Sequence, residues 1–350
     1  MIGRRPSLLV FAFIALANPG AAAGQAFPDG VERAFADWTV TCDNTHACWA
    51  QAFARDSETG VLSLKRQAGP DAELEIAFFG DLESAVFDTP GYEAAFAGAG
   101  DVPRFDDSPW GYLIAPVHTD LFIQALLDAT TLSDSVSTIP LAGASAAMGF
   151  LDEVQGRAGT VTALVTKGNQ PASAVPAASE MPVILAPATT AHIIEDEPGA
   201  ALTAASVKTC GGENVDTPFE PEGVRLDDGR EIWLMPCSSG MYNFIYAGLL
   251  KDGDAISELV FTGPKQDGLD MHELWNGHIA TSQESVKSPD TALTLTTFER
   301  GRAMSDCGDM TEHVWTGQAF ALVRHVGIAH CLGLSAINWP TRWQAEVKAE

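Results

Sequence analysis

Alternating apolar and polar positions in the first part of the chain predict paired strands. Apolar residues recur at every second position from Ala36 to Cys42, which is the period of a half-buried strand. Turn residues at 43–47 separate this strand from a second one at 48–54, so Cys42 and Cys48 lie across the mouth of a hairpin. Two further strand-like runs predict a meander, at residues 61–66 and 73–79.

A helical period follows these strands. Apolar residues fall at helical spacing over 120–129 and again over 147–154, which predicts two amphipathic helices. Gly156 is placed to end the second helix. Residues 160–166 then predict a closing strand.

A segment rich in proline and alanine divides the chain. Its prolines are irregularly spaced, which is typical of a linker, and we assign residues 169–200 to it. The expected N-terminal domain spans residues 24–168 and the C-terminal domain residues 201–350. In the second domain the pattern predicts strands at 231–235, 242–248 and 343–347, and a hairpin about Thr316-Gly317. The expected fold class is α+β and mainly antiparallel β, with two β-rich domains, sandwich-like or meander, and a few short helices.

Residues 1–23 have the pattern of an export signal. Arg4 and Arg5 precede an apolar run over 8–17, and small residues over 21–23 resemble a signal-peptidase site. This run is too short to span a bilayer, and no later stretch approaches ~18 consecutive apolar residues. We therefore expect a periplasmic or otherwise exported protein with no membrane insertion.

The charge of the chain limits its partners. It has 46 acidic and 20 basic residues and a formal net charge of −26. Removal of residues 1–23, which contain two arginines and no acid, would bring the charge to about −28. Such a field repels phosphate backbones, so nucleic acid is not an expected partner. A solvated acidic surface is the simpler interpretation, and a cationic substrate or partner is the alternative.

Six cysteines in an exported chain predict disulfide bonds. If the domains fold independently, Cys42 must pair with Cys48, and three arrangements remain for the other four cysteines. Among these we favour the local pairs Cys210–Cys237 and Cys307–Cys331. No Cys-x-x-Cys sequence is present, which argues against thioredoxin-like exchange and zinc ribbons.

The sequence contains no convincing catalytic or metal-binding motif. Nucleophile elbows, Walker loops and zincin helices are missing, so we predict no catalytic residue, no metal and no cofactor. The histidines group loosely with acids at 272–278 and 312–313, where turn or core positions are the simpler interpretation. Calcium is a weaker alternative in the turns that hold Asp252, Asp254, Asp306 and Asp309.

Six residues are candidate contacts with a ligand or partner. In so acidic a chain, an arginine near a turn can bind an anion or a partner, or pair internally with a carboxylate. Tyr242 and Asn243 have the same two interpretations, since asparagine often holds a turn through its own backbone. The candidates are Arg66, Arg157, Tyr242, Asn243, Arg302 and Asp306.

Several short motifs together resemble one known family. They are Phe35-Ala36-Asp37-Trp38 before Cys42-Asp43-Asn44, Leu151 to Arg157, Cys237 before Tyr242-Asn243, Asp306-Cys307-Gly308, and Trp339 to Trp343. The chain resembles, over nearly its whole length, an uncharacterised exported bacterial family known as domain of unknown function 1176. Its N-terminal half is similar, more weakly, to the invasion-associated locus B family of envelope proteins. These resemblances imply location and architecture, because the first family has no assigned reaction.

Elimination leaves a binding function as the leading hypothesis. We expect a non-enzymatic periplasmic module that binds a small ligand or an envelope protein, held together by three disulfides. The alternative is a periplasmic hydrolase or metal-dependent enzyme whose residues converge only in three dimensions. A purely structural protein is a third interpretation.

Overall fold

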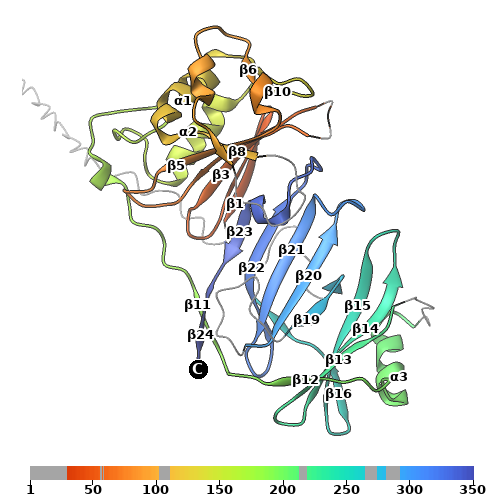
Figure 1. Cartoon of the computed structure of the whole chain (residues 1–350). Helices are drawn as coiled ribbons and strands as arrows, with labels where there is room; N and C mark the ends of the chain where they lie inside the picture. The colour runs from red at the N-terminus through yellow and green to blue at the C-terminus, as the bar shows by residue number, and fades with distance from the viewer. Residues whose placement is uncertain are drawn as a thin grey trace, which may run out of the picture.

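The structure is a computed structural model that describes residues 30–55, 57, 59–101, 111–212, 219–264, 274–280 and 292–350. The expected export signal lies outside these residues. Figure 1 shows the N-terminal half above a larger, β-rich C-terminal half. Within the described part of the chain, no helix has the length and apolarity needed to cross a bilayer.

The N-terminal half is built on an antiparallel sheet of seven strands. They lie in the order β1-β2-β3-β4-β5-β8-β7, so the first five form the predicted meander. The expected strand at 61–66 is confirmed, and the one expected at 73–79 begins one residue later. The strands are β1 (Val31–Phe35), β2 (Trp38–Cys42), β3 (Cys48–Phe53), β4 (Val61–Arg66), β5 (Leu74–Phe79), β7 (Gly100–Asp101) and β8 (Gly111–Leu113).

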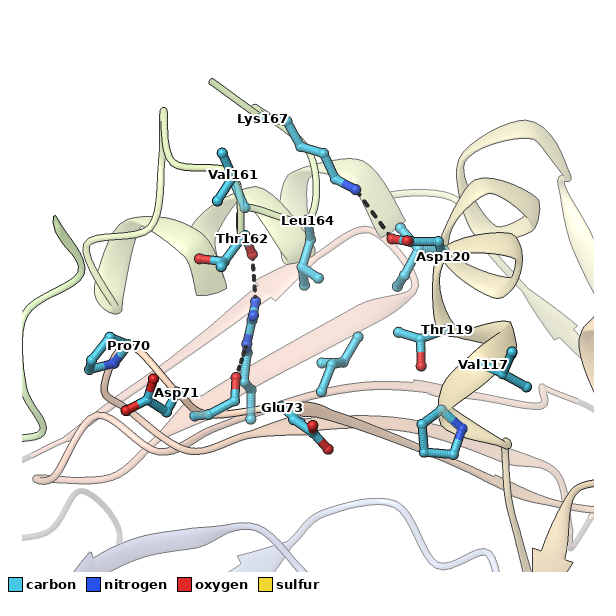
Figure 2. A pocket seen from close by; sticks show the side chains of 16 residues that line it. Pro70, Asp71, Glu73, Val117, Thr119, Asp120, Val161, Thr162, Leu164 and Lys167 are labelled. Carbon is cyan, nitrogen blue, oxygen red and sulfur yellow. Dashed lines mark hydrogen bonds and ion pairs between the residues drawn. The ribbon is translucent and has the colours of Figure 1, made fainter. Parts of the chain in front are cut away.

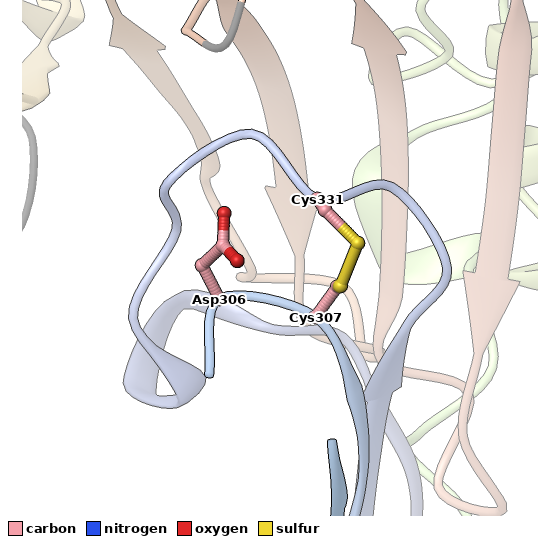
Figure 3. Close-up of side chains that lie close together, drawn as sticks. All are labelled: Asp306, Cys307 and Cys331. Carbon is pink, nitrogen blue, oxygen red and sulfur yellow. A yellow bond between two sulfur atoms is a disulfide. The ribbon is translucent and has the colours of Figure 1, made fainter. Parts of the chain in front are cut away.

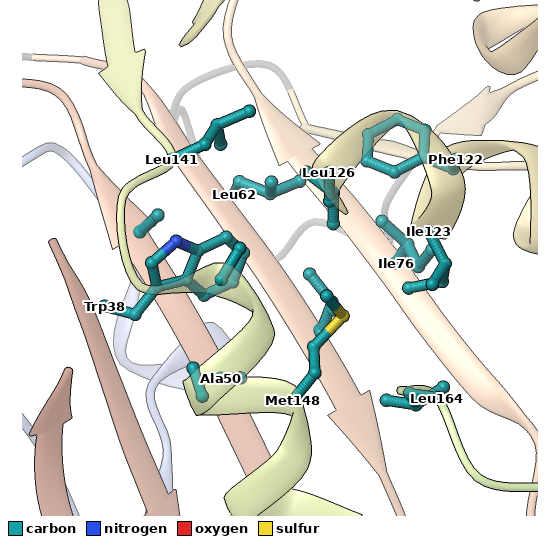
Figure 4. Packing of buried hydrophobic residues seen from close by; sticks show 14 of the residues in the cluster. Trp38, Ala50, Leu62, Ile76, Phe122, Ile123, Leu126, Leu141, Met148 and Leu164 are labelled. Carbon is teal, nitrogen blue, oxygen red and sulfur yellow. The ribbon is translucent and has the colours of Figure 1, made fainter. Parts of the chain in front are cut away.

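Two helices cover one face of this sheet, α1 (Thr119–Asp128) and α2 (Ala144–Val154), close to their predicted positions. A small sheet lies beside them, formed by β6 (Val86–Phe87), β9 (Thr131–Ser133) and β10 (Thr138–Pro140). Apolar side chains from alternate strand positions meet the helices in a buried core (Figure 4). Trp38, Leu62, Phe122 and Met148 are among them. Short 3-10 helices occur at 82–84, 93–96, 116–118, 172–174 and 336–338.

The strand expected at 160–166 is wrong. These residues form turns, with a single bridge between Thr160 and Gln170. The backbone amides of Leu164 and Val165 donate to the buried Asp152 carboxylate, at 2.7 and 3.2 Å, instead of to a neighbouring strand. Hydrogen bonds to the Asp152 side chain therefore take the place of the β-ladder hydrogen bonds that the sequence pattern predicted.

The C-terminal half contains two sheets that pack face to face. Residues from both sheets, including Leu234, Tyr246, Leu295, Trp315 and Phe320, form one buried cluster, which gives the sandwich its core. The first sheet has the order β12 (Ala191–Ile193), β13 (Glu222–Leu226), β14 (Glu231–Ser239), β15 (Phe244–Asp252), β16 (Ala255–Glu258), and β18 (Leu274–Trp275) pairs with β15. Helix α3 (Ala200–Thr209) packs on its other face through Leu202.

The second sheet contains the hairpin expected about Thr316-Gly317, which is confirmed as β21 and β22. The Pro/Ala-rich segment 169–200 also adds strands to this half: β12 enters the first sheet, and β11 (Val183–Ala186) pairs in parallel with β24 (Glu346–Ala349). The order of the second sheet is β17 (Phe261–Thr262), β22 (Phe320–Ile328), β21 (Gly308–Trp315), β20 (Thr294–Arg300), β19 (His278–Ala280), and β23 (Thr341–Gln344) pairs with β22.

All three predicted disulfides are present. Cys42–Cys48, Cys210–Cys237 and Cys307–Cys331 have Cα separations of 4.0, 5.2 and 4.8 Å. Each joins residues close in sequence, so each stabilises a local loop rather than joining the two halves.

The second face of the N-terminal sheet packs against the C-terminal half. Phe53 and Phe79 from the sheet share a buried cluster with Val326, Leu334 and Trp339. Beside this cluster Asn44 pairs with the backbone of Gln344: its Nδ2 donates to the carbonyl, and its Oδ1 accepts from the amide, both at 2.9 Å. The asparagine side chain thus extends a β-ladder across 300 residues of sequence.

Replacement of Asn44 tests this contact. Asn44→Ala leaves a partly buried amide and carbonyl of Gln344 without partners, which lowers the free energy of unfolding by about 2–4 kcal/mol. Urea denaturation measures the loss, and Asn169→Ala, at an exposed position, is the matched control at under about 0.5 kcal/mol. Equal losses in both variants would show that the pairing does not stabilise the fold.

His313 predicts a pH dependence of stability. It lies fully inside the C-terminal half, against Phe261 and 3.5 Å from the Thr311 hydroxyl. Burial, with a smaller contribution from the charge of His325, lowers its pKa from 6.5 to about 3. Between pH 6.5 and 3 the unfolded chain therefore binds a proton at this position and the folded chain does not. The free energy of unfolding falls as the pH drops from 6.5 toward 3.

His313→Gln removes this contribution. Between pH 6 and 4.5 the wild-type free energy of unfolding should fall more steeply than that of the variant, by up to about 1.4 kcal/mol per pH unit. Urea denaturation at several pH values gives both slopes. His192→Gln, at an exposed position on β12, should keep the wild-type slope. Parallel slopes for His313→Gln and wild type would contradict the assignment.

Candidate functional site

The six candidate contact residues gather in two places. Tyr242, Asn243, Arg302 and Asp306 lie around the loop between β20 and β21, and Arg66 and Arg157 lie together in the N-terminal half. The sequence offered no sign that these residues would group in this way, because members of each group are up to 91 residues apart. What each group can bind depends on which polar atoms the fold itself already uses.

The group near β20 and β21 is held by internal hydrogen bonds. Tyr242 Oη donates to the Gly301 carbonyl at 3.0 Å. Asn243 Nδ2 donates to the Arg300 carbonyl at 2.8 Å, and its Oδ1 accepts from the Arg300 amide at 3.0 Å. Asn276 Nδ2 donates to the same Oδ1 at 2.8 Å. These side chains therefore fasten the tip of the β14–β15 hairpin to the second sheet.

Arg302 and Asp306 form a local ion pair beside a disulfide. Arg302 Nε donates to Asp306 Oδ1 at 2.7 Å, and the Gly333 amide donates to Oδ2 at 2.6 Å. The hydrogen bonds from Arg302 lower the pKa of the Asp306 carboxyl despite its burial. Figure 3 shows this carboxylate next to Cys307 and Cys331, whose sulfur atoms bond to each other. They offer no thiolate to a metal ion, so the group is a brace for the loop.

In the N-terminal half, Arg157 is wholly buried, and each of its three nitrogens donates a hydrogen bond. Its Nε donates to Gln155 Oε1 and its Nη1 to the Thr162 hydroxyl, each at 3.0 Å, and its Nη2 donates to the Gly69 carbonyl. It joins the end of α2 to the β4–β5 turn and to the loop over 157–170. Asp152 holds the other side of that loop.

Arg66 differs from Arg157 because its guanidinium is only partly used. It is the last residue of β4 and is 7% exposed. Its Nε donates to the Ala72 carbonyl at 3.2 Å and its Nη1 to the Thr162 carbonyl at 2.9 Å. Among the residues that the structure describes, Nη2 has no acceptor. Burial, together with the nearby charge of Arg157, lowers the pKa of Arg66 to about 10, so it is still a cation at neutral pH.

A cavity of about 400 Å³ opens over Arg66 (Figure 2). Apolar walls come from both sides of the cavity and include Ile123, Val161 and Leu164. Charged groups stand near the mouth, where Lys167 Nζ lies 3.2 Å from Asp120 Oδ1. Asp71 and Glu73 complete the charged lining. We refer to this cavity as the Arg66 pocket.

Sequence reasoning found Arg66 but missed the acids and the lysine around it. Asp71 and Glu73 come just before β5, and Lys167 follows by almost 100 residues. The sequence feature that could have indicated the acids is the pair of charges just after the Gly69-Pro70 turn. Both charged side chains line the pocket at the end of the sheet.

A second cavity, of about 300 Å³, lies between the halves. It is lined by Trp49 and Lys65 from the N-terminal sheet and by Arg324 and Trp339 from the C-terminal half, and Lys65 Nζ stands 5.7 Å from the centre of the Trp49 ring. Both tryptophans are at least nine-tenths buried, so their ring faces are already used in packing. We refer to this cavity as the central groove.

A buried histidine pairs with an acid away from both cavities. His325 Nε2 lies 2.8 Å from Asp309 Oδ1, which also accepts from Arg342 Nη1 at 2.7 Å. His325 is buried, and the pair is absent from the linings of the Arg66 pocket and the central groove. Arg342 continues to Glu32 at 3.1 Å, so this network joins the halves.

The sequence offered possible metal ligands among its histidines and acids. Among the described residues, the only group close enough to hold a metal ion is the disulfide group above. His278 lies 3.1 Å from Glu222 on the surface, and Asp309 is engaged as described. His272 and Glu273 lie outside the described residues.

Fold and site together define a β-rich protein with three disulfides and a small pocket at one end of its N-terminal sheet. The chain belongs to the family described as "Protein of unknown function (DUF1176)", which matches residues 32–346. It is also 29% identical over 333 residues to "Uncharacterized protein YpfG" of Escherichia coli (strain K12), across 89% of this chain and 92% of that protein. No solved structure matches the chain. The resemblance to domain of unknown function 1176 is thereby confirmed, and the weaker similarity to the invasion-associated locus B family stays a prediction.

Removal of Arg157 tests the scaffold under the pocket. Arg157→Gln leaves three acceptors without their donor, two of them buried, and Asp152 with one cation fewer, so the free energy of unfolding falls by about 3–5 kcal/mol. Arg55→Gln removes an arginine whose ion pair with Asp37 is exposed, and it costs at most about 1 kcal/mol. Urea denaturation measures both, and similar losses would contradict the structural role of Arg157.

Proposed function

We propose that this protein is a non-enzymatic binding module of the bacterial cell envelope, and that the Arg66 pocket takes a small molecule bearing a carboxylate. Three disulfides fit an oxidising, exported compartment. The pattern of residues 1–23 supports export, and an acidic surface suits a protein that must stay soluble after it. A periplasmic location is part of this proposal.

The observation that carries the proposal is the unused Nη2 of Arg66. A buried cation is costly unless hydrogen-bond acceptors surround it, and here two carbonyls serve only part of the guanidinium. The remaining donor belongs to a side chain that lines a cavity of ligand size. A carboxylate is the group that a guanidinium binds most strongly, because the hydrogen bonds are charge-assisted.

The lining supports binding over hydrolysis. The residues around the Arg66 pocket include no histidine, serine or cysteine. The Ser–His and Cys–His pairs of the common acyl-transfer hydrolases therefore have no member there. The buried pair of His325 and Asp309 is tied to Arg342 at the junction of the halves, which favours a structural role.

Four dipeptides test the requirement for a carboxylate. They are L-alanyl-L-alanine, its N-acetyl derivative, and the C-terminal amide of each, all small enough for a pocket of this volume. Isothermal titration calorimetry should show at least one free acid binding at least about tenfold more tightly than its own amide, since a hydrogen bond to a charged group contributes about 1.5–3 kcal/mol. Arg66→Gln should abolish this difference.

Lys65→Gln is the matched control. It removes the same charge from the adjacent residue of β4, whose side chain lines the central groove instead. Thermal unfolding checks that both variants are folded. If Arg66→Gln is too unstable to test, Arg66→Lys replaces it, because lysine keeps a cation at this position. The proposal fails if neither acid binds, or if Lys65→Gln weakens binding as much as Arg66→Gln does.

A further inference from the structure

The Arg66 pocket contains charges of both signs. Arg66 lines the cavity, and the buried Arg157 is close enough for its charge to act on Arg66. Near the mouth, Asp120 and Lys167 pair with each other and largely cancel. Asp71 and Glu73 remain, both exposed, and the described residues give neither of them an ion pair.

The positions of these acids decide which ligand fits. Asp71 and Glu73 line the same cavity as Arg66 (Figure 2). An anion without a compensating cation would share the cavity with two carboxylates, which repel it. A simple cation attracted by those carboxylates would meet two buried arginines. Neither kind of ion alone matches the pocket.

We propose that the Arg66 pocket binds a small zwitterion of the amino-acid type, a free amino acid or a dipeptide. Its carboxylate accepts from Arg66 Nη2, and its ammonium group lies against Asp71 and Glu73. This inference rests on the proposed function and adds the second charge of the ligand to it.

The uncharged part of the lining indicates the rest of the ligand. Side chains of Val117, Ile123, Val161 and Leu164 and the rings of Pro70 and Pro116 form the walls between the charged groups. Such walls favour a small aliphatic side chain, because they offer apolar contact and few partners for a polar one. Alanine and valine side chains are of this type.

The dipeptide set tests the ammonium group separately from the carboxylate. L-Alanyl-L-alanine should bind at least about tenfold more tightly than N-acetyl-L-alanyl-L-alanine, which keeps the carboxylate and lacks the cation. In the double variant Asp71→Asn/Glu73→Gln this ratio should fall below about threefold, since its two substitutions change only the charge, at exposed positions. High salt should lower the ratio as well.

Glu75→Gln is the control, because Glu75 lies on β5 but lines the central groove, and it should keep the wild-type ratio. The zwitterion proposal is overturned if the acetylated dipeptide binds as well as the free one, or if Glu75→Gln lowers the ratio as the double variant does. In that case a carboxylate preference that Arg66→Gln removes would leave the proposed function standing. Absence of binding by both acids would instead remove the proposed function itself.

Discussion

Burial of the N-terminal sheet on both faces is the constraint on which the rest of the structure depends. One face packs on α1 and α2, and the other packs on the C-terminal half through Phe53, Phe79 and Trp339. Polar residues on that second face are buried in consequence. Gln51 Nε2 on β3 donates to the Ser63 hydroxyl on β4 at 3.3 Å, within the N-terminal sheet. The open ends of the sheet are then the places where β-strand side chains can meet solvent and a ligand.

The Arg66 pocket lies at one of these ends, and its charges follow from the way the end is closed. Arg66 and Arg157 share one buried carboxylate, Asp152, so this cluster carries a net positive charge inside the protein. Backbone carbonyls of Gly69, Ala72 and Thr162 offset part of the cost of burying it. An anionic ligand at Arg66 would balance the remaining charge, so binding there would also stabilise the fold.

Sequence patterns predicted the local elements better than the contacts between them. The strand at 61–66 and the helices near 120–129 and 147–154 follow from apolar spacing alone. Each disulfide joins two cysteines that are consecutive in the sequence, which made the pairs accessible to prediction. The turns over 160–166 could not be foreseen, because two amides there bond to the side chain of Asp152. The packing between the two halves could not be predicted either. The sequence positions of Phe53 and Phe79 fit a solvent-facing edge as well as an interface.

The difference between local patterns and three-dimensional contacts also explains why the three candidate arginines have different roles. Sequence reasoning treated Arg66, Arg157 and Arg302 alike, as cations near turns in an acidic chain. The structure separates them by the acceptors around each guanidinium: Arg302 finds Asp306, and Arg157 finds Gln155, Thr162 and Gly69. Only positions in three dimensions decide how many of an arginine's five donors the fold uses, and that number distinguishes an arginine that braces a loop from one that can hold a ligand.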